Sequence, residues 1–359
     1  MFTMIRSISK IRSGKAYWLR ITMLLLILQS CHNEFEGESY EANKPYRLEI
    51  PNDFPALAVD TVINPVTVNG VALGKKLFYE GKLSRNNAIS CGFCHIQEFA
   101  FTHHGHTVSH GIDNRMGIRN APPIQNLAFL RNYTWDGVSH HLDERSLVPI
   151  TTDFEMDSTL PDAVAKLKAD AHYQKLFRAA YGDDEITGER ILKALSQFMT
   201  TMISANSKFD RVSSGTATFT TDESQGYSLF QNHCMGCHSG ALFTDQSFRN
   251  TGMYYNPDLA DRGRYRVTMN AEDHMKFRVP SLRNVEFTAP FMHDGRFSTL
   301  EAVLNFYSDQ VENYSNLDPL LRKNGHLGIP LNAEEKRKLI IFLKTLSDPD
   351  FINNPKFAE

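Results

Sequence analysis

The chain has 359 residues, of which 42% are hydrophobic and 22% charged, and its formal charge at pH 7 is −3. These values are typical of soluble globular proteins, and they exclude a disordered chain and a bundle of membrane-spanning helices. They also give no sign of a basic nucleic-acid-binding surface, so we expect no nucleic-acid partner. The length allows two ordinary domains, each with its own hydrophobic core.

The first 30 residues have the pattern of a bacterial export signal. Five basic residues precede the apolar run 21–28, and Gln29, Ser30 and Cys31 follow it. This run is much shorter than the about 20 apolar residues that a membrane-spanning helix needs. A small residue directly before a cysteine resembles the cleavage site of bacterial lipoproteins, at which that cysteine is lipidated. We therefore predict a lipoprotein signal peptide over 1–30 and lipid attachment at Cys31, with an ordinary secretory signal as the alternative.

Removal of residues 1–30 leaves 33 basic against 41 acidic residues, a formal charge of −8. Residues 31–45 are polar, acidic and poor in large aliphatic side chains, which is typical of a flexible tether. We expect a lipoprotein of the cell envelope, anchored to a membrane and located in the periplasm.

Four of the five cysteines form two Cys-x-x-Cys-His motifs. In c-type cytochromes the two thiols bond to the vinyl groups of one haem, and the adjacent imidazole ligates the iron. A zinc site fits poorly because the pairs lie about 140 residues apart and each has its own histidine. A thioredoxin-like redox pair would not need that histidine twice. We predict two covalent c-type haems, one at Cys91, Cys94 and His95 and one at Cys234, Cys237 and His238.

A short repeat precedes the two motifs, because residues 74–78 and 226–230 both read Gly-x-x-Leu-Phe. In a helix, this glycine allows close approach of a second helix, and the leucine and phenylalanine share a buried face. Apolar residues at helical spacing predict a closing helix for each half. The first spans 189–204. The second begins with Asn332 and Glu335 as a capping box and ends before Pro349.

Few runs of residues alternate with period two, so little sheet is expected. We predict a mainly α fold of two cytochrome c-like haem domains with long irregular loops. The polar stretch 204–220 is the predicted interdomain linker. The expected domains are an N-terminal peroxidatic domain over 46–210 and a C-terminal electron-transfer domain over 211–359.

The order of motifs from Gly74 to the final helix resembles the bacterial di-haem cytochrome c peroxidases and their MauG-type relatives. Besides the two haem motifs, the resemblance rests on the segments 109–111 (Ser-His-Gly), 119–122 (Arg-Asn-Ala-Pro), 133–137 (Tyr-Thr-Trp-Asp-Gly), 154–156 (Phe-Glu-Met), 277–284 and 288–295. It implies an enzyme that reduces hydrogen peroxide to water, with electrons relayed from the C-terminal to the N-terminal haem. The donor is expected to be a small cytochrome c, a cupredoxin or a quinol, and a homodimer is common in the family.

The resemblance also implies a ligand on the far side of the N-terminal haem, which leaves the iron on activation. His110 matches this ligand best, because it lies in a His-Gly context before the Arg-Asn-Ala-Pro segment. Histidines 103, 104 and 106 are close enough in sequence to compete for the role.

Further family positions fall on Glu155, Trp135 and a calcium site. Glu155 matches the distal glutamate that moves protons, and its apolar neighbours favour a raised pKa. Trp135 matches a tryptophan between the two haems. One calcium ion is implied between the domains, held by the Asn120 side chain and by the carbonyls of Thr288 and Pro290.

The chain departs from the peroxidases at the second haem. Where they usually place a methionine opposite the residue that corresponds to His238, this chain has Tyr307, as the MauG-type relatives do. A phenolate stabilises ferric iron, whereas a thioether favours ferrous iron. Met292 is the rival ligand. This departure keeps two alternatives open: a MauG-like oxidase that modifies a partner protein, and a non-catalytic electron-transfer di-haem cytochrome.

Overall fold

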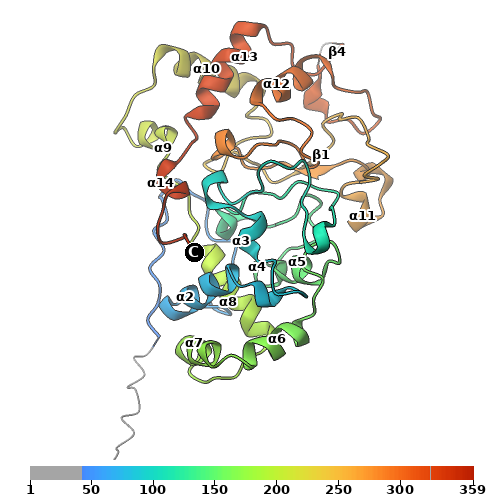
Figure 1. The fold of residues 1–359 in the computed structure, drawn as a ribbon. Coiled ribbons are helices and arrows are strands. Elements are labelled where there is room, and N and C mark those ends of the chain that lie inside the picture. The colour runs from blue at the N-terminus through green and yellow to red at the C-terminus, as the bar shows by residue number, and fades with distance from the viewer. Residues whose placement is uncertain (1–42, 324) are drawn as a thin grey trace, which may run out of the picture. The chain divides into compact units, whose positions relative to one another are not determined.

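Helices dominate the part of the chain that the structure, a computed structural model, describes: residues 43–323 and 325–359 (Figure 1). Among these residues, no helix has the length and apolar character needed to cross a membrane. The predicted signal peptide, the predicted lipid site at Cys31 and most of the predicted tether lie outside the described residues. The predicted mainly α fold is confirmed.

The α-helices and their bounds are α2 (Val68–Phe78), α3 (Cys91–Cys94), α4 (Leu142–Arg145), α5 (Leu147–Thr151), α6 (Leu160–Lys168), α7 (Ala171–Tyr181), α8 (Gly188–Thr200), α9 (Lys208–Ser213), α10 (Thr221–His233), α11 (Tyr265–Thr268), α12 (Leu300–Asp309), α13 (Ala333–Lys344) and α14 (Pro349–Ile352). Two antiparallel pairs of two-residue strands complete the fold: β1 (Phe248–Arg249) with β2 (Phe277–Arg278), and β3 (Arg322–Lys323) with β4 (His326–Leu327). Long irregular segments connect these elements, as predicted.

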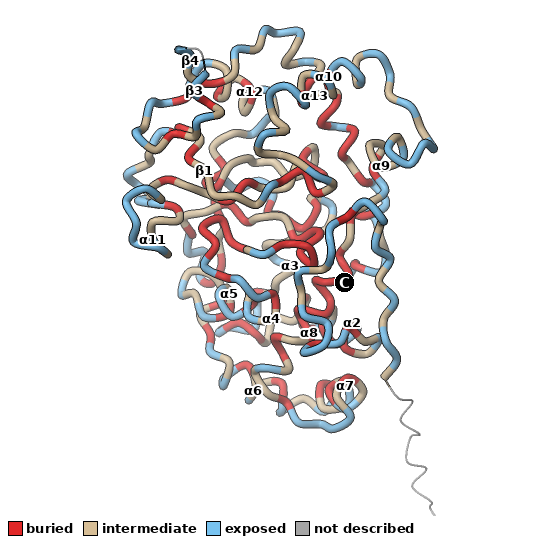
Figure 2. Tube along the Cα trace, turned by 180° about the vertical axis from the view of Figure 1, so that it is seen from behind, coloured by how far each residue is buried: buried red, intermediate tan, exposed pale blue. Residues whose placement is uncertain are grey.

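Helix α2 packs against α8 through its glycine. A Cβ atom on Gly74 would lie 1.9 Å from the carbonyl oxygen of Ala194, so only glycine allows this approach. Leu77 and Phe78 are buried in the core beside it. The first copy of the predicted helix pair is therefore confirmed, and Figure 2 shows α8 as a largely buried helix.

Helices α10 and α13 repeat the arrangement. A Cβ atom on Gly226 would lie 2.1 Å from the carbonyl oxygen of Lys338. Phe230 is fully buried. Helix α13 begins with the predicted capping box, in which the Asn332 side chain accepts from the backbone N–H of Glu335 and the Glu335 carboxylate accepts from that of Asn332.

One predicted helix end and the predicted role of Pro349 are wrong. Helix α8 stops at Thr200 rather than continuing to residue 204, and the hydroxyl of Thr201 donates to the Phe198 carbonyl. Helix α13 stops at Lys344, and Pro349 begins α14 instead of ending the preceding helix. The Asp348 side chain caps α14, and proline is favoured at the first position of a helix because it needs no N–H donor there.

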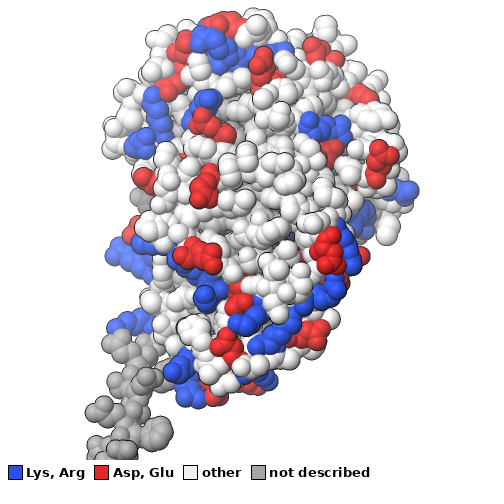
Figure 3. Space-filling model, in the orientation of Figure 1, with Lys and Arg blue, Asp and Glu red and all other residues white. Residues whose placement is uncertain are grey.

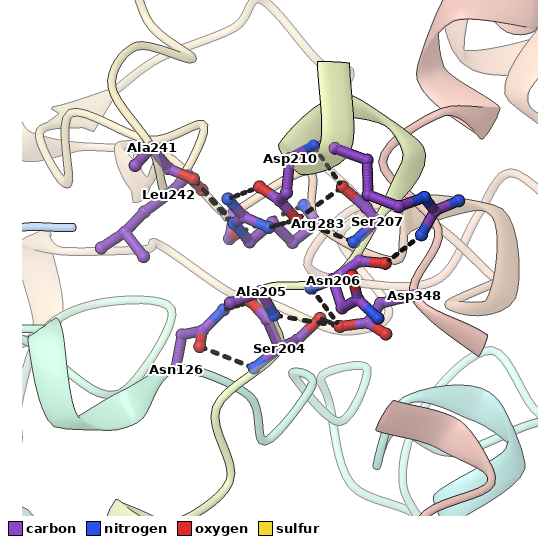
Figure 4. Close-up of polar contacts among 12 residues, drawn as sticks. Asn126, Ser204, Ala205, Asn206, Ser207, Asp210, Ala241, Leu242, Arg283 and Asp348 are labelled. Atoms are coloured by element: carbon purple, nitrogen blue, oxygen red, sulfur yellow. Dashed lines mark hydrogen bonds and ion pairs between the residues drawn. The ribbon is translucent and has the colours of Figure 1, made fainter. Parts of the chain in front are cut away.

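The stretch predicted as a linker contains α9, and Asp210 on this helix forms a buried ion pair with Arg283 (Figure 4). Both terminal nitrogens of Arg283 donate to the Asp210 carboxylate, at 2.9 and 2.8 Å. The side chain of Arg283 is only 1% exposed, and its Nε donates to the carbonyl of Ala241 at 2.7 Å. Residues 204–220 are thus fixed to the second half of the chain by a buried charge pair. The division into domains 46–210 and 211–359 remains a prediction.

The last residues of the chain return to the core of the first half. Phe351 and Phe357 pack there around Phe101, at ring-centroid distances of 5.6 and 6.2 Å. The hydroxyl of Tyr79 donates to the Phe357 carbonyl at 2.7 Å. In Figure 1 the C-terminus accordingly lies beside α2 and α8, so the C-terminal segment completes the N-terminal core.

Candidate functional site

Each Cys-x-x-Cys-His motif lines one large cavity. The space between the side chains is ≈ 1430 Å³ around the first motif and ≈ 1680 Å³ around the second, open mouths included. All four motif cysteines are free thiols rather than disulfides. Each cavity therefore offers two thiols and one imidazole to a large ligand.

The two motif histidines are held in the same way. Nδ1 of His95 lies 2.6 Å from the carbonyl oxygen of Phe101, and Nδ1 of His238 lies 3.1 Å from that of Phe243. Because a carbonyl only accepts, Nδ1 carries the proton and donates it, which leaves the Nε2 lone pair free. Burial lowers the pKa of both imidazoles, that of His95 to about 4. Both rings are therefore neutral and suited to ligate iron.

Each cavity also offers a cationic side chain that suits the carboxylates of a haem, half-buried Arg145 in the first and buried Arg278 in the second. Arg145 lines the first cavity, and its Nη1 is buried without a hydrogen-bond partner. Arg278 lines the second, is 6% exposed, and donates to the carbonyls of Thr134 and Val279 at 3.4 and 3.3 Å. Burial lowers the pKa of Arg278 to about 10. A buried guanidinium without a carboxylate partner favours an anionic ligand group, so the residues present fit a haem in each cavity.

Glu155 lies in the first cavity with Cys91, Cys94 and His95. Burial raises the pKa of its carboxyl group, and the positive charge of Arg145 opposes this rise. Among the described residues, none donates a hydrogen bond to this carboxylate. A half-buried carboxyl group with a raised pKa and no fixed partner is able to hold or release a proton inside the cavity.

The backbone of Glu155 is fixed by the loop that follows the first motif. Its carbonyl oxygen accepts from the N–H of Ile112 at 2.8 Å. A Cβ atom on Gly111 would lie 2.3 Å from the same oxygen. Gly111 therefore allows the loop and the Glu155 backbone to touch, and this contact places the carboxyl group in the cavity.

His110 does not lie among the residues that line the first cavity, although its neighbours Ser109 and Gly111 do. Its ring packs instead against His103 and His106, at centroid distances of 4.9 and 4.5 Å. Its backbone carbonyl is 3.5 Å from Sγ of Cys94. In this conformation the His110 imidazole is thus next to the first cavity but turned toward the other histidines.

Trp135 lines both cavities, as does Asn120. The indole ring is 8% exposed, and its Nε1 donates to the Asn120 carbonyl at 2.8 Å. Its own carbonyl accepts from the N–H of Arg278 at 2.8 Å. The tryptophan is therefore fixed between the two cavities by residues of both halves.

Tyr307 and Met292 both line the second cavity with His238. Tyr307 lies on α12, and burial raises the pKa of its phenol. Met292 has a backbone φ of +72° in the turn before His293. The structure thus brings both candidate ligands to the cavity that the sequence assigns to them, and the choice between them remains a prediction.

The residues of the predicted calcium site meet at the second cavity, which Asn120, Thr288 and Pro290 all line. Asn120 is 5% exposed, and its Nδ2 lies 2.6 Å from the Pro290 carbonyl oxygen. Its Oδ1 is buried without a hydrogen-bond partner. An orphaned amide oxygen beside a backbone carbonyl is chemically suited to a hard cation, once the amide is turned so that Oδ1 faces the carbonyl.

The sequence does not reveal that arginines line the two cavities or that backbone carbonyls orient the motif histidines. Arg145 lies in none of the motif segments, and Arg278 lies in the segment 277–284, whose sequence does not reveal that its arginine lines a cavity. The carbonyls of Phe101 and Phe243 follow their histidines by six and five residues, but a backbone group leaves no signal in side-chain identity.

Comparisons with known proteins agree with this geometry. The family model of the di-haem cytochrome c peroxidases matches residues 68–218. The methylamine utilization protein MauG of Methylorubrum extorquens is 35% identical over 82% of this chain and 82% of its own length. The cytochrome c551 peroxidase of Nitrosomonas europaea is 34% identical over 80% of this chain and 84% of its own.

Among solved structures, a MauG-like protein associated with microbial copper homeostasis superposes with a TM-score of 0.79 at 32% identity, and covers 87% of this chain and 99% of its own. The chain belongs to the di-haem cytochrome c peroxidase family, which includes the MauG proteins. It is an oxidoreductase of this family, and the family carries two haems.

Proposed function

We propose that this protein reduces hydrogen peroxide to water in the cavity of its first haem motif, consuming two electrons and two protons for each peroxide. The observation that carries the proposal is the Glu155 carboxyl group, which shares that cavity with Cys91, Cys94 and His95 and has no hydrogen-bond donor of its own among the described residues. A protein that only stored or passed electrons would have no use for a free acid at this position.

A haem attached at Cys91 and Cys94 supplies an iron centre that binds peroxide and exchanges electrons with it. The protein's own residues do the remaining work. His95 presents Nε2 to the iron because the Phe101 carbonyl holds its Nδ1 proton. Glu155 moves one proton between the two oxygen atoms of peroxide, for which its raised pKa suits it.

Arg145 contributes a positive charge to the same cavity. Its buried Nη1, without a partner, is available to a haem carboxylate or to the developing negative charge on oxygen. The same charge limits how far the pKa of Glu155 rises, so the carboxyl group can release its proton as well as hold it.

The test is the substitution Glu155→Gln, which keeps the shape of the side chain and removes its proton. We expect kcat/KM for peroxide, measured with a reduced electron donor, to fall by about 10²–10⁴-fold, the range of general acid–base contributions. Glu144→Gln is the matched control, because Glu144 is exposed on the nearby helix α4. Unchanged turnover in Glu155→Gln, with both haems present, would overturn the proposal.

A second candidate is a MauG-like oxidase that uses peroxide to oxidise a partner protein. It is favoured by the 35% identity to MauG and by Tyr307 in the second cavity. The two functions differ in their need for electrons. Peroxide added to the fully oxidised protein should react at once if it is a MauG-like oxidase, whereas a peroxidase with His110 on its iron should require prior reduction.

We propose that the second half, with a haem at Cys234, Cys237 and His238, receives electrons from the donor. Tyr307 is the proposed ligand opposite His238. It lies half-buried on α12 and lines the same cavity, where binding to the metal as a phenolate would offset the cost of removing its hydroxyl from water. Trp135 borders both cavities and is the proposed aromatic bridge between them.

Further parts of the proposal concern calcium, location and partners. The orphaned Oδ1 of Asn120, with the carbonyls of Thr288 and Pro290, supports one calcium ion between the halves. The export signal supports a periplasmic protein, anchored through lipidated Cys31. A small cytochrome c, a cupredoxin or a quinol is the proposed donor, and a homodimer is the proposed assembly.

A further inference from the structure

Three imidazoles gather beside the first cavity, and only one of them, His110, has a role proposed above. His103, His106 and His110 form this three-histidine cluster, in which one ring nitrogen from each residue lies within 4.8 Å of the others. The ring centroids of His103 and His106 are 5.0 Å apart, and His110 lies 4.9 and 4.5 Å from them.

The cluster contains buried nitrogen atoms that no protein group satisfies. His103 is 4% exposed, and its Nδ1 has no hydrogen-bond partner. Nδ1 of His110 is likewise buried and unpartnered. Burying a polar atom without a partner is costly, so these atoms point to a missing ligand.

The loop that carries the cluster is fixed at both ends. The hydroxyl of Thr102 donates to the Ala121 carbonyl, just before His103. The N–H of Ser109 donates to the Arg119 carbonyl at 2.9 Å, just before His110. Between them, the Thr107 carbonyl packs so closely on Gly295 that a Cβ atom there would lie 1.9 Å from it. Only the segment around His106, which is exposed, is free to adjust.

From this geometry we infer that His103, His106 and His110 form a binding site for one divalent transition-metal ion, Zn²⁺ or Cu²⁺. Three imidazoles without a carboxylate suit these borderline metals far better than calcium or magnesium. Bonds of about 2.0–2.1 Å to a tetrahedral ion place the nitrogens roughly 3.3 Å apart. The ring nitrogens now lie within 4.8 Å of one another, so the exposed His106 has to move toward the other two rings to reach this spacing. Water fills the fourth position on the metal.

The site has a consequence that rests on the proposed role of His110 as an iron ligand. One imidazole cannot lie in this cluster and reach the iron of the first haem at the same time. Metal binding therefore holds His110 away from the iron and keeps that coordination position open to peroxide.

The test of the site is a Zn²⁺ titration of the holoprotein, prepared without a histidine tag and treated with a chelator before calcium is restored. Calorimetry should show one Zn²⁺ per chain. His103→Ala and His106→Ala should each weaken this binding by about 100-fold or more, because each removes one of three ligands. His104→Ala is the matched control, since His104 lies in the same loop but stacks on Phe99 at 3.9 Å.

His106→Ala is the decisive variant, because an exposed side chain can be removed without disturbing the fold. No Zn²⁺ bound, or binding that His106→Ala leaves unchanged, overturns the site. Absorption spectra of the oxidised protein separate this inference from the proposed function. An increase in high-spin haem on adding Zn²⁺, absent in His106→Ala, supports both. Binding that depends on His106 without any spectral change supports the site and counts against His110 as an iron ligand.

Discussion

The two halves of the molecule repeat one arrangement, a helix pair joined at a glycine and a motif histidine held by a backbone carbonyl, which we call the frame. In the first, α2 meets α8 through Gly74, and in the second, α10 meets α13 through Gly226. In both, the motif histidine donates Nδ1–H to a backbone carbonyl a few residues later. The repeated frame thus determines the side of each cavity that carries the thiols and the imidazole.

The other residues that line the two cavities differ. The first contains Glu155, which has a raised pKa and no hydrogen-bond donor among the described residues. The second contains Tyr307 and Met292, and its lining carboxylate, Asp318, is paired with Arg249 at 2.7 Å. The carboxylate of Asp318 thus has a fixed partner, whereas that of Glu155 has none among the described residues. The difference teaches that two cavities built on one repeated frame are distinguished by a few of their lining side chains. Figure 3 shows both signs of charge mixed over one face of the molecule, without a corresponding division.

The substitution expected to have the largest effect changes the reduction potential of the second haem, and it tests the contrast between the two cavities. Replacing Tyr307 by methionine exchanges a phenolate for a thioether, which favours ferrous iron. We expect the reduction potential of that haem to rise on the order of a few hundred millivolts, within the ~0.8 V that axial ligands span. A spectroscopic redox titration measures the shift. Met292→Leu should leave the potential unchanged, and the reverse pattern would identify Met292 as the ligand.

A smaller but still large effect is expected where the two halves meet. Asp210→Asn leaves the guanidinium of Arg283 buried without a counter-charge, since that side chain is only 1% exposed. Removing one partner of a buried pair costs about 3–5 kcal/mol. Urea unfolding should show this loss. Asp222→Asn, which breaks the exposed pair with Arg337, should cost less than about 1 kcal/mol. Equal losses in the two variants would show that the buried pair of Asp210 and Arg283 contributes no more to stability than the exposed pair.

The same ion pair predicts a loss of stability in acid. Burial alone would raise the pKa of Asp210, but the hydrogen bonds and charge of Arg283 more than offset it and lower the pKa. A carboxyl group with a lowered pKa stabilises the fold above its unfolded value, near 3.9. That contribution disappears as the pH falls through the folded value. We expect the melting temperature to drop below about pH 4, and to drop less steeply in Asp210→Asn.

How much of this could be predicted from the sequence depends on whether a feature leaves a side-chain signal. The Gly-x-x-Leu-Phe repeat and the Asn332 capping box are visible in the side chains, and the structure confirms both helix pairs. The ion pair of Asp210 with Arg283 leaves no such signal, because its two residues are 73 positions apart. The return of Phe357 to the first core is equally non-local.

The candidate site shows the same division. Glu155, Tyr307 and Met292 line the cavities of the haem motifs to which the sequence assigns them, and their roles remain predictions. The motifs do not reveal the direction of the His110 ring, which depends on how a loop closes onto two other histidines. Nor do they reveal Arg145, whose role depends on being buried beside a cavity rather than on its neighbours in sequence.

The smallest expected effect tests whether the two frames are equivalent. Gly74→Ala and Gly226→Ala each place a methyl group within 1.9 and 2.1 Å of a carbonyl oxygen of the facing helix. The helices have to separate, and such overpacking costs about 1–3 kcal/mol. Thermal unfolding, followed by the absorption of the haems, should show similar losses for both variants. Gly188→Ala is the control, because its methyl group meets only the Leu160 side chain. A loss confined to one of the two glycines would mean that the halves share a sequence pattern without sharing the packing that stabilises it.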